Sequence, residues 1–165
     1  MAGIDTDVAA DVAQSLPEEE VRICLFSMSG DYYAVTVDVL AEIIITQKVF
    51  PVPTTPSHVL GIINLRGNIV PIVDIRPALS LPQLSGINQI AIVNHERMIV
   101  GIVVDAVSEV IAVPRSSVLP LPAEISTQDA GIRRRSRFLR AVIQKGDTVA
   151  ALLDIDRLFE AIKLS

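Results

Sequence analysis

The sequence has no tryptophan, a single cysteine and no long hydrophobic run. Cys24 is the only cysteine, which excludes a disulfide framework and any zinc site built from several thiolates. The longest apolar run, residues 98–104, is much shorter than the roughly 20 residues that a membrane-spanning helix needs. No Lys or Arg precedes Arg22 and no long apolar stretch lies before it, which is unlike a secretory signal. We therefore expect a cytoplasmic protein that does not insert into a membrane.

Groups that could support catalysis are also scarce. The two histidines, His58 and His95, have no partner at a metal-ligand spacing, and we expect both on the surface and Cys24 in the core. The sequence contains neither a phosphate-binding loop nor a nucleophile-elbow motif. Asp154 and Asp156 are interpreted as the end of a strand and the cap of a helix, not as a cation site. These absences predict a protein that is not an enzyme and that holds no cofactor or metal.

Negative charge is concentrated at one end of the chain. The net charge is −5, and residues 1–20 alone contribute −6 because they contain six acids and no base. Residues 21–165 hold all 14 bases and the other 13 acids. An almost neutral body is not what general nucleic-acid binding requires. We expect a mobile acidic tail over residues 1–19, to which the sequence assigns no role, and one folded domain over residues 20–165.

The sequence is rich in β-branched residues. Val and Ile supply 42 of the 165 residues, and side chains of this shape fit a strand better than a helix. Short apolar runs separated by Gly-containing turns favour small barrels over a sheet with helical crossovers. We expect helical turns only near residues 38–44 and 105–110, a long connection over residues 114–137, and a final helix that Asp156 caps and that ends near Ile162. The strands predicted for this mainly β protein are residues 21–28, 32–37, 60–65, 69–75, 88–93, 98–104, 139–144 and 148–153.

The sequence also repeats itself. Residues 37–44 and 104–111 are identical at four of eight positions. A Pro-x-Pro segment and then a hairpin follow each copy, and this common order favours a repeat over chance similarity between apolar strands. These later features are residues 51–53 with 120–122, and residues 65–68 with 144–147. Because the second hairpin is one residue longer, it is expected to contain a β-bulge. The repeat predicts two barrels of similar design.

A basic run extends from Arg133 to Arg140 and contains five arginines. Such a run can bind nucleic acid or an acidic partner, and it can equally be a solvated loop before a strand. Phe138 is its only aromatic residue, whereas proteins that bind single-stranded nucleic acid use several aromatic side chains to stack on the bases. A small β-barrel nucleic-acid-binding protein is therefore the alternative function, although the near-neutral body and the missing aromatics speak against it.

One segment carries a distinctive motif. Residues 59–76 read Val-Leu-Gly-Ile-Ile-Asn-Leu-Arg-Gly-Asn-Ile-Val-Pro-Ile-Val-Asp-Ile-Arg, with Arg66 as a lone cation beside Gly67. This segment resembles the signature of the CheW family of bacterial chemotaxis coupling proteins. Further motifs resemble that family in the same order, so the similarity covers about residues 20–162. These motifs are residues 30–35, 39–44, 52–56, 100–110 and 152–159.

The resemblance implies a fold and a function. Members of this family have two five-stranded, SH3-like β-barrels around a shared core, which agrees with the repeat. They are adaptors without enzymatic activity, and they join the cytoplasmic tips of methyl-accepting chemoreceptors to the regulatory domain of a CheA-type histidine kinase. We therefore expect a mainly β protein of two tandem barrels, with short helical turns and a C-terminal helix, that is recruited to receptor arrays at the membrane.

The resemblance also implies which residues bind these partners. Glu42 and Arg66 match positions that the family uses for partner contacts, and they are expected to pair with each other at the rim of a barrel. Gly61 and Gly67 match positions that shape this surface. An apolar groove between the barrels is expected to take a receptor helix, because an apolar helix face binds readily in such a groove. The groove is expected near Leu40, Ile90 and Val104.

The last hairpin departs from the family pattern. Where the family usually has a Gly, this chain has Arg140 and Ala141, and the arginine-rich stretch before them is also unusual. We expect these departures to alter the partner surface of the second barrel.

Overall fold

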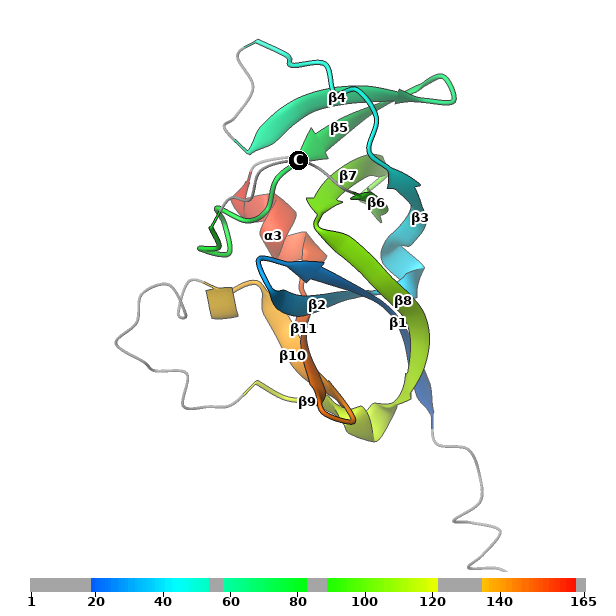
Figure 1. Cartoon of the computed structure of the whole chain (residues 1–165), viewed down its shortest axis with the longest axis vertical. Coiled ribbons are helices and arrows are strands. Elements are labelled where there is room, and N and C mark those ends of the chain that lie inside the picture. The colour runs from blue at the N-terminus through cyan, green and yellow to red at the C-terminus, as the bar shows by residue number, and fades with distance from the viewer. Residues whose placement is uncertain (1–18, 54–57, 83–88, 122–134, 163–165) are drawn as a thin grey trace, which may run out of the picture.

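The chain forms two β-sheets, which lie one above the other in Figure 1. The computed structural model describes residues 19–53, 58–82, 89–121 and 135–162. The expected acidic tail lies outside these residues except for Glu19, and so do the first two arginines of the basic run. Among the described residues the structure has eleven strands, so the predicted mainly β class is confirmed.

The larger sheet has six strands in the order β8-β1-β2-β11-β10-β9. Its strands are β8 (Ala106–Pro114), β1 (Glu20–Met28), β2 (Asp31–Thr36), β11 (Thr148–Leu153), β10 (Leu139–Lys145) and β9 (Val118–Leu119). The smaller sheet has five strands in the order β3-β6-β7-β5-β4. Its strands are β3 (Leu40–Ile45), β6 (Gln89–His95), β7 (Met98–Val104), β5 (Asn68–Val73) and β4 (Val59–Leu65).

The two sheets share one topology, in agreement with the sequence repeat. Each has an antiparallel edge strand, a hairpin, a parallel pair and a second hairpin in the same spatial order. They are interleaved along the chain, because β3 to β7 form the smaller sheet and the larger sheet combines β1 and β2 with β8 to β11. The larger sheet has a sixth strand, the two-residue β9, whose counterpart in the smaller sheet is a single bridge between Phe50 and Ile62.

The hairpin β4–β5 of the smaller sheet and the hairpin β10–β11 of the larger sheet carry the same irregularity. The register shifts between Val59 and Gly61 in β4, and between Leu139 and Ala141 in β10. The β-bulge predicted for the β10–β11 hairpin is thus present, but the β4–β5 hairpin has it too. It therefore reflects the common design of the two barrels and not an inserted residue.

The turns of these hairpins correct the sequence comparison. Leu65 pairs with Asn68, and Lys145 pairs with Thr148, so each hairpin closes through a two-residue turn. The alignment of the two sequence repeats made Arg66 equivalent to Lys145. The strand registers show instead that Leu65 is the residue equivalent to Lys145. The expected difference in hairpin length is therefore wrong.

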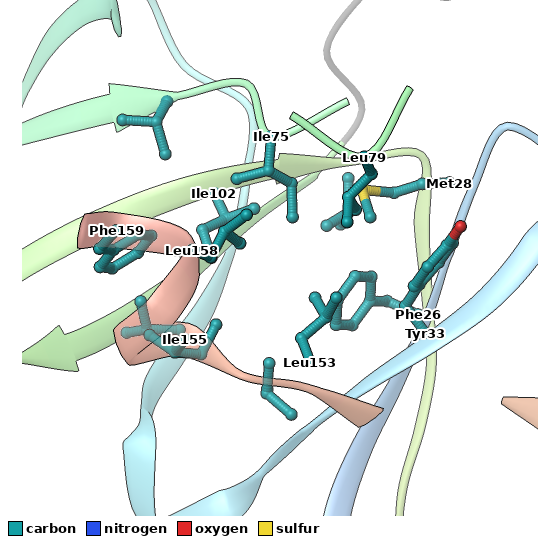
Figure 2. Packing of buried hydrophobic residues seen from close by; sticks show 14 of the residues in the cluster. Phe26, Met28, Tyr33, Ile75, Leu79, Ile102, Leu153, Ile155, Leu158 and Phe159 are labelled. Carbon is teal, nitrogen blue, oxygen red and sulfur yellow. The ribbon is translucent and has the colours of Figure 1, made fainter. Parts of the chain in front are cut away.

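The main hydrophobic core lies between the barrels and draws residues from both, as the expected shared core requires. The helix α3 (Ile155–Ala161) lies against this core and turns its buried face into it, as Figure 2 shows. Smaller clusters fill the interior of each barrel. Because a single barrel of this size buries little surface, sharing a core lets the two stabilise each other. Side chains of the shared core that Figure 2 labels include Phe26, Tyr33, Ile75, Leu79, Ile102, Leu153, Leu158 and Phe159.

Both predicted helical turns are largely strand. Near residues 38–44 only the 3-10 helix η1 (Val37–Val39) forms, and β3 begins at Leu40. Residues 106–110 belong to β8, and the expected long connection after it contains the 3-10 helix η2 (Arg115–Ser117) and β9. In both places β-branched residues pair with a neighbouring strand, and this pairing outweighs the local helix signal.

The cap of α3 lies two residues before the predicted one. Asp154, not Asp156, is the N-cap, and its carboxylate accepts a hydrogen bond from Arg157 N at 3.1 Å. Asp156 lies in the first turn, where its charge suits the positive end of the helix. Two aspartates two residues apart gave no means of choosing between them from sequence.

Candidate functional site

Strand β3 and the turn between β4 and β5 bring an acid and a base together. In β3 the register shifts between Leu40 and Glu42, which turns the Glu42 side chain toward that turn. Arg66 and Gly67 form the turn with φ values of +51° and +86°. Gly67 N donates a hydrogen bond to Asn64 Oδ1 at 2.8 Å. Two successive positive φ values are the geometry of a tight hairpin, and a glycine at the second position accommodates it without strain.

Glu42 and Arg66 form a two-pronged ion pair, which we call the rim pair. Arg66 Nη1 donates to Glu42 Oε1 at 3.2 Å, and Arg66 Nη2 contacts Oε2. The side chain of Arg66 is 68% exposed and that of Glu42 is 32% exposed. The hydrogen bond to Glu42, and then its negative charge, raise the pKa of the Arg66 guanidinium. An exposed pair of this kind contributes little to folding.

Gly61 serves the same surface indirectly. It has a φ of +151°, and a Cβ atom there would lie 2.3 Å from the backbone oxygen of Phe50. Phe50 and Ile62 exchange two backbone hydrogen bonds of 2.9 Å, which close the free edge of β4. Gly61 therefore lets residues 49–50 approach the strand, and this contact leaves Phe50 half exposed with Lys48 Nζ 5.1 Å from its ring centroid.

The expected apolar groove is not lined by all the residues assigned to it. Ile90 and Val104 are both fully buried. Ile90 belongs to the interior of the five-stranded barrel and Val104 to the shared core, so neither presents its side chain to a groove. Leu40 alone of the three is partly exposed. The alternation of strand residues explains the error, because apolar character does not tell which residues of a β-rich chain face inward.

Other apolar side chains take their place at the boundary between the barrels. Leu40 and Ile43 of β3, Val39 of η1 and Val107 of β8 are only partly buried and pack against the shared core. We call this surface the seam. β3 and β8 are edge strands of different sheets. The sequence repeat could have pointed to Val107, because the alignment of residues 37–44 with 104–111 makes it equivalent to Leu40.

The six-stranded barrel has an ion pair of its own, whose glutamate occupies the place that matches Glu42. Glu109 Oε1 accepts from Lys145 Nζ at 3.4 Å, and both side chains are about half exposed. They lie at the mouth of a cavity of about 450 Å³, which Leu25, Tyr32, Ser108, Gly146 and Thr148 also line. Sequence reasoning did not single out this pair.

The described part of the basic run is partly engaged within the fold. Arg135 Nε donates to Leu79 O at 3.1 Å, and Arg135 Nη1 lies 4.0 Å from Asp31 Oδ2. Arg137 and Arg140 are exposed, on either side of Phe138. The run thus helps to hold the loop after β5 against the six-stranded barrel.

His95 is buried, contrary to the expectation of a surface residue. Its ring packs edge-on against Phe159 of α3, with 5.0 Å between ring centroids. Its Nδ1 lies 3.2 Å from Asp156 Oδ1, at an ion-pair distance but without hydrogen-bond geometry. Cys24 is buried as expected, and burial raises the pKa of its thiol. Neither residue is therefore presented to a ligand.

Among the residues that the structure describes, no helix is long and apolar enough to cross a membrane. The same residues contain no group of three or more His, Cys, Asp or Glu side chains arranged to hold a metal ion.

Comparison with known proteins places this geometry in a family. The model of the CheW-like domain matches residues 22–163, which is most of the chain. The chain belongs to the CheW family. It is 28% identical to the chemotaxis protein CheW of Treponema pallidum (strain Nichols) over 159 residues, which cover 93% of this chain and 90% of that protein. It is also 28% identical to the chemotaxis protein CheW of Klebsiella aerogenes over 167 residues, covering 100% and 95% of the two. The crystal structure of the scaffolding protein TtCheW from Thermoanaerobacter tengcongensis is similar with a TM-score of 0.72 and 28% identity, covering 88% of this chain and 94% of that one.

Membership of the CheW family decides between the classes of function that the sequence left open. CheW proteins are non-catalytic scaffolding adaptors of chemotaxis, so the expectation that this chain is not an enzyme is confirmed. The fold of two SH3-like subdomains is confirmed as well. The family implies chemoreceptors and a CheA kinase as the partners.

Proposed function

We propose that this CheW protein joins the cytoplasmic tips of methyl-accepting chemoreceptors to the regulatory domain of a CheA-type histidine kinase. The observation that carries the proposal is the match of the CheW-like domain over residues 22–163, together with a rim pair whose guanidinium fork is exposed. An adaptor of this kind acts in the cytoplasm, at receptor arrays on the membrane.

Two surfaces with different chemistry support binding of two partners. The rim pair offers one charge of each sign, Arg66 on the tight turn and Glu42 on β3, and suits a partner with the opposite arrangement. The seam, with Leu40, Ile43 and Val107, is apolar, and edge strands of both sheets contribute to it. An amphipathic helix buries its apolar face in such a surface, so the seam suits the helical tip of a receptor.

The proposal is tested by titrating the purified protein with a receptor-tip fragment and with the kinase regulatory domain, separately and together. We expect it to bind each partner and to hold both in one complex, which analytical ultracentrifugation detects as a species containing all three components. Binding of neither partner would contradict the proposal, and so would strict competition between them. The substitution Leu40→Asp should weaken receptor binding selectively, since it places a charge in the apolar seam.

A matched control separates recognition from a general loss of surface charge. Arg115 and Glu19 form another exposed ion pair, at 3.1 Å, with side chains 64% and 71% exposed. This pair lies at the start of β1 and the end of β8, away from the rim pair and the seam. Arg115→Ala should leave both affinities unchanged.

A further inference from the structure

The chain crosses back from the five-stranded sheet to the six-stranded sheet at one residue, Asp105, between β7 and β8. Asp105 N donates to Ser27 O at 3.0 Å, and Asp105 Oδ2 accepts from Ser29 N at 2.7 Å. These bonds attach the crossing to the end of β1 and to the turn before β2. Asp105 Oδ1 contacts Nη2 of Arg76. One carboxylate therefore connects the six-stranded barrel with a guanidinium.

That guanidinium comes from the other barrel. Arg76 follows β5 of the five-stranded sheet, where Asp74 Oδ1 accepts from Arg76 N at 3.0 Å and lies 3.6 Å from Arg76 Nη1. The side chains of Arg76, Asp74 and Asp105 are 3%, 8% and 19% exposed. A charged fork held away from water is directional, and dissolved salt screens it little. This cluster is therefore a buried electrostatic contact between the barrels.

The seam depends on the same crossing. Val107, which lines the seam, lies two residues after Asp105, and Val107 N donates to Gln89 Oε1 of β6 at 2.6 Å. The seam also includes Leu40 of β3, and β3 and β8 are not hydrogen-bonded neighbours. The width of the seam is therefore set by how the two barrels are oriented and not by a sheet that continues across it.

We infer that Arg76 is a positioning residue, which acts through Asp105 to fix the angle between the barrels and so the width of the seam. The shared core alone does not define this angle as sharply, because apolar attraction is non-directional. The planar fork of a guanidinium has a preferred orientation to its carboxylate, and it supplies that direction. The consequence for receptor binding rests on the proposed function, whereas the consequence for barrel orientation does not.

The test compares variants that remove the fork, and in the double variant the Asp105 carboxylate is neutralised together with Arg76. Arg76→Met keeps the length of the side chain, and Asp105→Asn keeps an oxygen that can accept from Ser29 N. The double variant combines them. Arg115→Met is the control, since the same substitution there breaks an exposed ion pair between an arginine and a carboxylate, Glu19. Circular dichroism and the melting temperature establish that each variant is folded.

Barrel orientation is read without any partner from backbone N–H residual dipolar couplings. In the wild type one alignment tensor should fit the couplings of both sheets. In the double variant each sheet should still fit its own tensor, while the joint fit fails. The affinity for a receptor-tip fragment should fall by about tenfold or more, which corresponds to a modest loss of binding free energy. Arg115→Met should show neither change.

Each alternative outcome is decisive. A joint fit as good as that of the wild type would overturn the positioning role, whether or not the receptor-tip fragment binds. A changed orientation with unchanged affinity would overturn the link between Arg76 and binding, and it would show that the seam is not the docking site. If the double variant does not fold, Arg76→Lys takes its place, because it keeps the charge and lacks the fork. For Arg76→Lys the joint fit of both sheets to one alignment tensor should also become worse. A joint fit as good as that of the wild type would overturn the inference.

Discussion

Glu109 and Lys145 pair at the mouth of one barrel as Glu42 and Arg66 pair at the rim of the other. The two glutamates occupy equivalent places in the repeat, directly after a shift of strand register in β8 and in β3. Their cations do not, because Arg66 lies in the hairpin turn and Lys145 ends β10. The repeat has thus kept an acid and a base together while changing which base is used.

This difference between the cations predicts unequal roles. Lys145 offers a single contact at 3.4 Å, whereas Arg66 holds its glutamate with two nitrogens. An ammonium is a compact charge and lacks the fork that recognises a carboxylate with two bonds. We expect Lys145→Ala to lower the affinity for receptor tip and kinase less than Arg66→Ala does, in parallel titrations. An equal or larger loss for Lys145→Ala would show that the mouth of the six-stranded barrel is an equally important docking surface.

Gly61 provides a prediction about stability. Gly61→Ala should destabilise the protein by about 2–4 kcal/mol, because the new Cβ would meet the backbone of Phe50 at a φ of +151°. Gly67→Ala is the matched control, since nothing lies within 4 Å of its Cβ position and only its φ of +86° is unfavourable, which costs about 1 kcal/mol. Denaturant unfolding measures both losses, and hydrogen exchange at Phe50 and Ile62 reports whether their bridge opens. Similar losses of stability for both variants would mean that the added Cβ displaces residues 49–50 at little cost, and would contradict this prediction.

Stability should fall in alkaline solution. Burial raises the pKa of the Cys24 thiol above its usual 9.0 and that of the Tyr33 hydroxyl above its usual 10.0. As the pH rises through these usual values, the unfolded chain loses protons that the folded chain keeps, so the free energy of unfolding decreases. Below about pH 8 both groups stay protonated in either state and contribute no slope. Urea unfolding between pH 7 and pH 10.5 checks this, and Cys24→Ala should reduce the decrease. A free energy of unfolding that rises over this range would contradict it.

Much of the fold could be predicted from local patterns. Strands that alternate with Gly-containing turns are visible because β-branched runs and turn residues are local signals, and the repeat revealed two similar barrels. The segments 38–44 and 105–110, where helical turns were expected, are largely strand apart from η1, since pairing of β3 with β6 and of β8 with β1 depends on residues far away in sequence. The interleaving of the two sheets is likewise a property of long-range pairing.

The site could be predicted in part. The pairing of Arg66 with Glu42 followed from the family resemblance, and the geometry agrees because a tight turn and a strand bulge fix both side chains. Ile90 and Val104 were assigned to a groove although they are buried, because apolar character is the same for a core residue and a groove residue. The contact of Arg76 with Asp105 was not predicted, since it joins segments of different sheets.

The central claim is that the rim pair serves recognition and not folding, and the behaviour of Arg66→Ala tests it most directly. The measurement compares the melting temperature with the affinities for the receptor-tip fragment and the kinase regulatory domain in the same preparation. We predict a melting temperature close to that of the wild type, because the pair is exposed, and a loss of most of the binding to at least one partner. Arg66→Lys should restore that binding only in part. Unfolding of Arg66→Ala, or wild-type affinity for both partners, would contradict the claim.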